Sequence, residues 1–294
     1  MDAIRTPEAV LEDLPDFPFA PHYREVGGLR LAHLDEGDGP PVVMWHGEPT
    51  WSFLWRKVLP PVRDAGYRVI CPDLVGFGRS DKPTDRDWYS YDRHVACAAT
   101  LLEDLDLRGA TFVVHDWGGP IGLRLAMEHA DRVDRIVIMD SGLPVGVPMG
   151  EEWQRFRAFV DRIEDVPMAP ILRGGTETEL SPEVLAAYEK PFPDPASKAG
   201  MRAFPGLIPQ APDQPGAAEG RAVLEHLRND GRPKLLLWAE GDLVLPPQVG
   251  EMMAAALGVA GPTPIAGAGH FLQEDKGAEI GALIADWLQD GRRP

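Results

Sequence analysis

Short apolar segments alternate with amphipathic segments along most of the chain. The apolar segments are rich in β-branched residues, and several lack the polar alternation of a strand with one face in water. We therefore predict strands at residues 29–34, 42–45, 67–71, 111–115, 135–139, 234–238 and 263–266, several of them covered on both faces. Helical periodicity is found at residues 91–105, 119–128 and 278–288. This alternation predicts an α/β domain with a mostly parallel central sheet that is flanked by helices.

One segment interrupts the alternation. Between residues 143 and 220 no strand pattern is found, and Pro and Gly separate helical pieces at 151–163 and 181–189. A helical insertion at this point would cover the carboxyl edge of the sheet, where open α/β folds bind ligands. We therefore predict a core formed by residues 1–142 and 221–294, with residues 143–220 as a helical cap.

Charge and cysteine content narrow the classes of partner. The 294-residue chain has a net charge of −17, which argues against nucleic acid and against an anionic membrane surface, because both attract clustered Lys and Arg. No run of 18 apolar residues predicts a membrane span, and no secretory signal pattern is found. Cys71 and Cys97 form neither a disulfide framework nor a metal-ligand spacing. A cytoplasmic location is therefore expected.

The strongest chemical motif follows the apolar strand at 111–115. There Asp116 is followed by Trp117, Gly118 and Gly119, and a helical pattern begins at once. This is the arrangement of a nucleophile elbow, a tight strand-to-helix turn that exposes one side chain above the sheet. The glycines allow close approach, and the helix N-terminus directs backbone N–H groups at the site. Asp116 is the candidate nucleophile; the alternative is that it only caps the helix.

A second motif, His46-Gly47-Glu48-Pro49, directly follows another apolar strand. A loop at this position can supply one backbone N–H to an oxyanion hole, and the residue after the nucleophile supplies the other. The expected pair is the backbone N–H groups of Glu48 and Trp117. A simple turn would also explain the motif.

A histidine and an acid complete the pattern. His270 lies on a Gly-rich loop after the last predicted strand, although an exposed loop histidine would also fit. Asp242, after the strand at 234–238, is the expected acceptor for its Nδ1–H, and Asp140 is the rival. We favour Asp242 because its turn is closer to His270 in the sequence. The order nucleophile, acid, histidine, each after a strand, predicts an α/β-hydrolase fold with an inserted cap.

These motifs resemble those of the haloalkane dehalogenases. The matching segments are residues 46–56, 72–83, 116–119, 187–194 and 266–274, so the resemblance covers nearly the whole chain. It implies that Asp116 displaces halide from an sp³ carbon to give an alkyl-enzyme ester. It further implies that His270, held by Asp242, activates the water that hydrolyses this ester. The implied partners are a small apolar halogenated substrate, water and a halide ion.

The resemblance also implies N–H donors for the departing halide, and the Trp117 indole is the first. One branch of the family has Asn after His-Gly as a second donor. This chain has Glu48 there, whose carboxylate would repel a halide, and so resembles the branch with a cap tryptophan and an acid after the later strand. Trp153 is the only tryptophan of the predicted cap, although the family pattern places this donor nearer Phe156. Core packing of a helical stripe with Phe159 is the alternative.

Other functions fit the motifs less well. Epoxide hydrolases share the Asp elbow and the His–acid pair, but they need two acidic groups in the cap, normally tyrosines, and the predicted cap contains only Tyr188. A ligand receptor on this scaffold predicts a broken triad, and here every position is filled. A plain esterase is disfavoured because carboxylate attack on an ester gives an anhydride. We expect no metal and no organic cofactor, since neither ligand spacing nor a dinucleotide motif is found.

Overall fold

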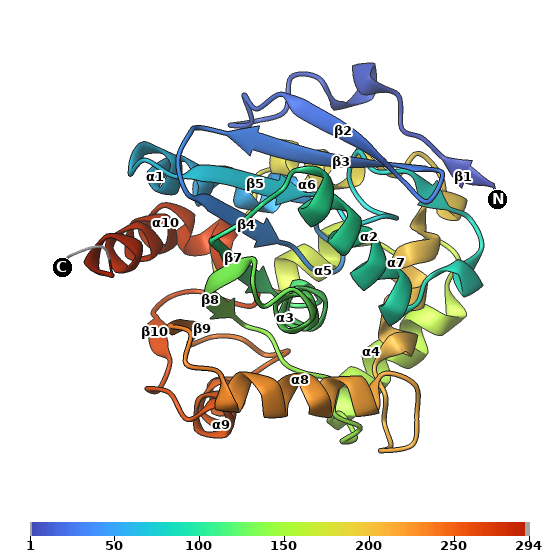
Figure 1. Ribbon diagram of the computed structural model, residues 1–294. Helices are drawn as coiled ribbons and strands as arrows, with labels where there is room; N and C mark the ends of the chain where they lie inside the picture. The colour runs from blue at the N-terminus through green and yellow to red at the C-terminus, as the bar shows by residue number, and fades with distance from the viewer. Residues whose placement is uncertain (1, 292–294) are drawn as a thin grey trace.

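The computed structural model describes residues 2–291 and has an eight-stranded sheet at its centre (Figure 1). The strand order is β10-β9-β8-β7-β4-β5-β3-β2. The neighbours from β10 to β5 pair in parallel, whereas β3 is antiparallel to both β5 and β2. The strands are β2 (Pro21–Val26), β3 (Leu29–Glu36), β4 (Pro41–Trp45), β5 (Arg68–Pro72), β7 (Ala110–His115), β8 (Val133–Met139), β9 (Lys234–Ala239) and β10 (Thr263–Ile265). The predicted α/β-hydrolase fold class is confirmed.

The seven predicted strands correspond to β3, β4, β5 and β7 to β10. The sequence analysis missed β2, an edge strand whose side chains are mostly exposed, so that it lacks the apolar run of a central strand. It also missed β1 (Ala3–Ile4) and β6 (Lys82–Pro83), which pair antiparallel as a separate two-residue ribbon. Such short pairs carry no periodic signal.

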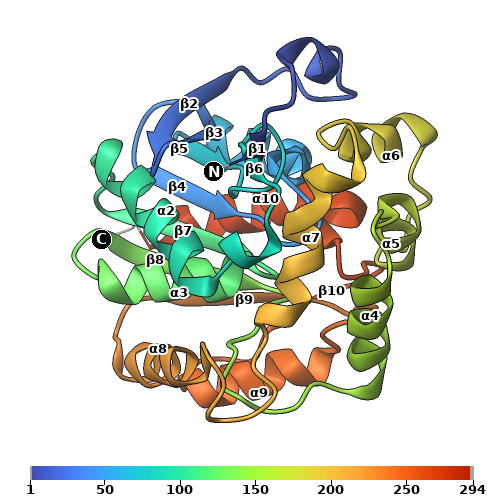
Figure 2. The ribbon, with the colours of Figure 1, turned by 90° about the vertical axis from the view of Figure 1, so that its right-hand side faces the viewer.

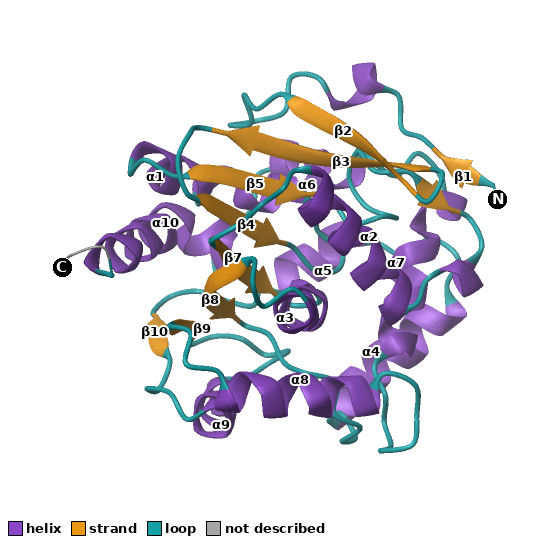
Figure 3. Cartoon of the chain, viewed as in Figure 1, coloured by secondary structure: helices purple, strands orange, loops and turns teal. Residues whose placement is uncertain are grey.

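Helices cover both faces of the sheet (Figure 3). On one side α1 packs on α10, and on the other side α3 contacts α2 and α8. Their bounds are α1 (Leu59–Asp64), α2 (Tyr91–Asp104), α3 (Gly118–Glu128), α8 (Ala217–Asn229), α9 (Pro247–Leu257) and α10 (Leu272–Asp290). None of the helices within residues 2–291 is long and apolar enough to cross a membrane. Cys71 and Cys97 are free thiols.

The chain between β8 and α8 forms helices and no strand. They are α4 (Glu151–Arg162), α5 (Met168–Gly174), α6 (Pro182–Glu189) and α7 (Ala199–Ala203), with 3₁₀ turns at Pro195–Lys198 and Phe204–Leu207. Figure 2 shows these helices together on the side of the sheet to which β4 points. Helix α8 begins at Ala217, inside the segment expected to be the cap, and packs on α3 and α9.

The turn from β7 into α3 requires glycine at its last two positions, Gly118 and Gly119. Strand β7 is fully buried, and α3 begins at Gly118 directly against the loop after β4. A Cβ atom on Gly118 would lie 2.1 Å from the carbonyl oxygen of Trp45, and one on Gly119 would lie 1.7 Å from the Ser141 Oγ. The two glycines therefore set how closely the helix N-terminus approaches the ends of the strands.

We expect Gly118→Ala to lower the free energy of unfolding by about 1–3 kcal/mol, because the added methyl group forces the backbone of β4 and α3 apart. Gly174→Ala, in α5 and with no atom near its Cβ position, is the control, and we expect it to be neutral or slightly stabilising. Urea unfolding followed by circular dichroism measures both variants. Equal urea midpoints for the two variants would contradict the close approach of α3 to the end of β4.

Candidate active site

Asp116 lies at the end of β7 in a left-handed backbone conformation, with a φ of 47°. Its carbonyl oxygen accepts hydrogen bonds from the Gly119 N–H at 2.9 Å and from the Ser141 hydroxyl at 2.7 Å. Helix α3 is capped by Trp117 and has no side-chain cap bond, so the capping alternative for Asp116 is wrong. The Asp116 side chain is 19% exposed, whereas its neighbours His115 and Trp117 are buried.

The His46-Gly47-Glu48 loop meets the Asp116 carboxylate directly. The Glu48 backbone N–H donates to Asp116 Oδ1 at 2.7 Å, and the backbone N–H of Trp117 also interacts with this carboxylate. A Cβ on Gly47 would lie 2.1 Å from Oδ1, so only glycine fits between the loop and the acid. Both backbone donors expected from the sequence therefore converge on the candidate nucleophile.

His270 lies between two aspartates. Its Nδ1 donates to Asp242 Oδ2 at 2.8 Å, and its Nε2 lies 3.7 Å from Asp116 Oδ2. The other oxygen of Asp242 accepts the backbone N–H groups of Val244 and Leu245 at 2.7 and 2.9 Å. Asp242 is thus fixed at both oxygens and orients the imidazole, as a triad acid does.

The charges of this cluster stabilise one another. Burial opposes ionisation of Asp116, but the nearby His270 outweighs it and holds the pKa of the carboxyl below its usual value. Burial likewise opposes protonation of His270, yet the negative charges of Asp242 and Asp116 raise its pKa well above the ordinary range. The two carboxylates therefore favour the protonated form of the ring.

Asp140, the rival acid, contacts the backbone instead of the imidazole. Its Oδ1 accepts the Ala239 N–H at 3.0 Å, and its Oδ2 is buried with no hydrogen-bond partner among the described residues. Burial and the nearby charge of Asp242 raise the pKa of Asp140 well above its ordinary value. These surroundings favour the neutral form of Asp140, and its backbone is also left-handed, with a φ of 34°.

His115 supports the loop that carries His270, a role that the sequence did not reveal. Its Nε2 donates to the His270 carbonyl oxygen at 2.8 Å, and burial lowers its pKa to about 4, so the ring is neutral. Atoms of His115, Asp140 and His270 lie within 4.8 Å of one another, as potential metal ligands do. Because Asp242 and the His270 carbonyl already bind ring nitrogens of the two histidines, we interpret the group as hydrogen-bonding support for the site.

The two tryptophans expected to bind halide have different surroundings. Trp117 is buried against Phe204, with ring centres 4.9 Å apart, and its indole N–H has no acceptor among the described residues. Trp153 is half-buried on α4, and its described ring contact is with the Arg157 guanidinium at 5.7 Å. Phe156, one turn further, packs against the core, whereas Phe159 is 45% exposed. The predicted packing stripe therefore does not include Phe159.

Two acids after His270 connect its loop to the helical segment between β8 and α8. Glu274 is buried, forms an ion pair with Arg56 and accepts the Tyr188 hydroxyl at 2.5 Å. Asp275 accepts the backbone N–H of Gly269 at 2.9 Å, and it also accepts the N–H groups of residues 177 and 178 at 3.1 and 2.7 Å. The sequence analysis matched this stretch to a family but did not identify these contacts, which join residues far apart in the chain.

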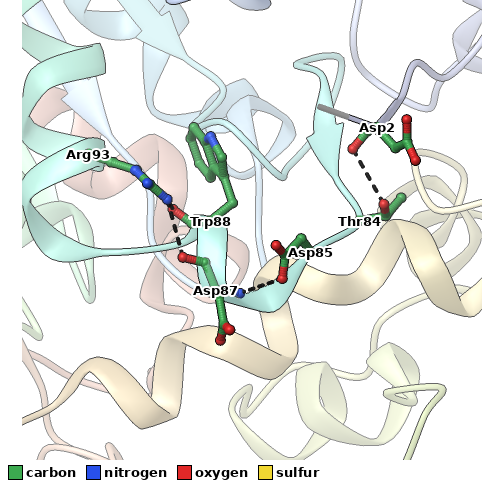
Figure 4. Close-up of a pocket in the computed structure, with 6 residues that line it drawn as sticks. All are labelled: Asp2, Thr84, Asp85, Asp87, Trp88 and Arg93. Atoms are coloured by element: carbon green, nitrogen blue, oxygen red, sulfur yellow. Dashed lines mark hydrogen bonds between the residues drawn. The ribbon is translucent and has the colours of Figure 1, made fainter.

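A surface hollow of about 520 Å³ lies apart from these residues (Figure 4). Its lining is Asp2, Thr84, Asp85, Asp87, Trp88 and Arg93. The Arg93 guanidinium donates to the carbonyl oxygens of Asp87 and Trp88, and the Asp85 carboxylate accepts the Asp87 N–H. Its polar groups serve the local backbone, and none of them belongs to the cluster around Asp116.

Comparison with known proteins agrees with this geometry. A family model described as the α/β hydrolase fold matches residues 40–277. Haloalkane dehalogenases of Mycobacterium marinum and Psychrobacter cryohalolentis are 42% and 41% identical, covering 98% and 100% of this chain and 100% of each relative. The fold and the match define the protein as an α/β hydrolase. It belongs, by this full-length similarity, to the haloalkane dehalogenase family of hydrolases.

Solved structures of the same family superpose on the chain. Haloalkane dehalogenase DpaA from Paraglaciecola agarilytica, whose structure is tetrameric, gives a TM-score of 0.88 at 36% identity, covering 96% of this chain and 97% of that one. DbeA from Bradyrhizobium elkani gives 0.81 at 27% identity, covering 92% and 98%. The similarity thus includes both the sheet and the helical segment between β8 and α8.

We expect Asp242→Asn to lower the pKa of His270, because the largest favourable charge beside the imidazolium is removed. Asp140→Asn is the matched control and should change this pKa little, since it replaces an acid that is already neutral. Nuclear magnetic resonance of the ring ¹⁵N signals across a pH titration measures both. A larger fall of the His270 pKa in Asp140→Asn than in Asp242→Asn would show that Asp140, and not Asp242, is the acid that orients His270.

Proposed function

We propose that this hydrolase releases halide from small haloalkanes through a covalent ester on Asp116. The observation that carries the proposal is the position of the Asp116 carboxylate, held by the Glu48 N–H and 3.7 Å from His270 Nε2. A carboxylate suits attack on an sp³ carbon, because the resulting ester can then be hydrolysed at its own carbonyl. The family of the chain agrees with this chemistry.

In the first step, an oxygen of Asp116 attacks the carbon that bears the halogen. A new C–O bond forms, the carbon–halogen bond breaks, and the halide leaves with the electron pair. Because Oδ1 is held by the Glu48 N–H, we assign the attack to Oδ2, the oxygen nearer His270. The Trp117 indole N–H, which has no acceptor within residues 2–291, is available as a donor for the departing halide.

In the second step, His270 acts as general base. Alkylation removes the charge of Asp116, so His270 keeps only Asp242 as an anionic partner, its pKa falls, and its proton can leave. The neutral ring then accepts a proton from water while the water oxygen adds to the ester carbonyl carbon. The backbone N–H groups of Glu48 and Trp117 stabilise the oxyanion. Collapse breaks the bond between the ester carbon and the alkyl oxygen, the leaving alkoxide takes the proton from His270, and the second water proton then passes from the Asp116 acid to the neutral His270, which restores the carboxylate.

The proposal includes residues 143–220 as a cap that closes the site, with a small apolar substrate beneath it. The proposal places the chain in the branch of the dehalogenase family that has Glu after His-Gly, here Glu48, and the acid of the triad after the later strand, here Asp242. Trp153 remains the candidate cap donor for halide in this assignment, and the site needs no metal. A cytoplasmic location is part of the same proposal and follows from the cysteine content.

Epoxide hydrolysis is the second candidate, and one observation weighs against it. The hydroxyl of Tyr188 donates to the buried Glu274 and is next to Arg56, so it does not serve as an acid toward a substrate. Oxirane opening requires such an acid to protonate the leaving oxygen. A purely ligand-binding role would not need the fully assembled group of Asp116, His270 and Asp242.

We expect the purified protein to release bromide catalytically from 1,2-dibromoethane and 1-bromobutane. Asp116→Asn should release none above background, because the amide oxygen is a poor nucleophile and the variant has almost the same shape. Bromide is measured colorimetrically against time for both proteins. Turnover of styrene oxide without bromide release would instead support the epoxide hydrolase.

We expect His270→Gln to release about one bromide per protein molecule and then stop. Attack by Asp116 does not require a base, whereas hydrolysis of the ester does. Intact-protein mass spectrometry should then show an added alkyl group, located on Asp116 by peptide mapping. Continued turnover in this variant would exclude His270 as the base.

A further inference from the structure

We propose that the Glu48 side chain carries a proton and donates its O–H to the halide that leaves during the reaction. This inference rests on the proposed function. It assigns to the side chain a role separate from that of the Glu48 backbone N–H. The halide would then have two protein donors, the Trp117 indole and the Glu48 carboxylic acid.

The surroundings of the Glu48 carboxyl group differ from those of Glu274, the glutamate that is buried in the described chain. Its Oε1 is buried and has no hydrogen-bond partner among residues 2–291. Glu274, the comparable buried acid, is instead bound by Arg56, Lys57 and the Tyr188 hydroxyl. No cation is paired with Glu48, so nothing within the described protein compensates a negative charge there.

The neighbour of Glu48 makes such a charge still less favourable. The Glu48 backbone N–H is bound to Asp116 Oδ1, and the negative charge of Asp116 acts on the Glu48 carboxyl group. Two adjacent carboxyl groups do not both ionise in a site shielded from water. Asp116 has the imidazolium of His270 and two backbone donors, so it keeps the charge. Burial, and then the charge of Asp116, raise the pKa of Glu48 well above its ordinary value.

A protonated acid changes what Glu48 can bind. It offers an O–H donor in place of a repelling carboxylate, and the described residues contain no acceptor for that donor. A departing halide is an anion, and hydrogen bonds to anions are stronger than those between neutral groups. As Asp116 loses its charge on alkylation, the halide takes over the negative charge. The same repulsion therefore keeps the proton on Glu48 through the first step.

This role removes the difficulty that Glu48 posed in the sequence, where an ionised side chain would oppose halide release. It also supplies a second donor that does not depend on Trp153, whose described ring contact is with Arg157. The backbone of residue 48 serves the oxyanion in the second step, while its side chain serves the halide in the first.

The test is bromide binding to three proteins that differ only at this side chain. Glu48→Gln keeps the length and keeps a donor, whereas Glu48→Met keeps the length and removes it. Both retain the backbone N–H. Titration with sodium bromide, followed by quenching of tryptophan fluorescence, gives the Kd. We expect Met to raise the Kd about tenfold, the effect of losing one hydrogen bond to a charged group, and Gln to stay within about threefold of the parent protein.

Two results would overturn the proposal. Tighter binding by Glu48→Gln than by the parent protein would show that an ionised Glu48 repels halide. Equal affinity of the Met variant and the parent would show that the side chain does not contact halide. Infrared difference spectra of the parent against Glu48→Gln test the proton independently of the Met variant, since a protonated acid has its own carbonyl stretch and a carboxylate lacks it.

The binding test is separate from the proposed function. Bromide release by the parent protein tests the reaction, and bromide affinity tests Glu48, so the two can fail independently. A parent protein that turns over bromoalkanes with no loss of affinity in Glu48→Met would keep the reaction and reject the donor. Circular dichroism and thermal unfolding of each variant confirm that the compared proteins are folded.

Discussion

The imidazolium of His270 is the one positive charge around which the acids of the site are organised. Asp116 and Asp242 face the ring, whereas Asp140 and Glu48 have no cation partner in the part of the chain that the structure describes. A site shielded from water cannot hold four carboxylates with one cation, so the acids without a partner take up protons. In the proposed function, identical chemical groups thereby acquire different roles: Asp116 is the nucleophile, Asp242 orients the imidazole, and Asp140 and Glu48 are neutral acids.

The sequence was sufficient for the fold and for the main residues of the site because both depend on local signals. Continuous apolar strands are covered on both faces, so β7 and β8 could be located within a residue or two. Asp116, His270 and Asp242 each follow a strand, and parallel strands deliver their carboxyl ends to one edge of the sheet. The close contact of these three side chains could therefore be expected before any coordinates were known.

Features that depend on contacts between distant segments could not be predicted in the same way. The choice between Asp242 and Asp140 was made on sequence order alone, and only the distances show which carboxylate meets the imidazole. The protonation of Glu48 depends on the lack of a cation or donor near its carboxyl group in the described structure. A sequence motif does not show which partners a side chain will lack after folding. Strand β2 was not predicted because an edge strand with exposed side chains has little apolar pattern.

Asp275 binds two parts of the molecule with one carboxylate. It holds the backbone of the loop just before His270 and, at the same time, the backbone of residues 177 and 178 between α5 and α6. Any swing of α5 and α6 away from the core would break these bonds and loosen the loop that carries His270. Under the proposed function, exchange of substrate and alcohol with the solvent would then use a path that leaves this junction closed, and the dwell time of the product would depend on motions elsewhere in the helical segment between β8 and α8.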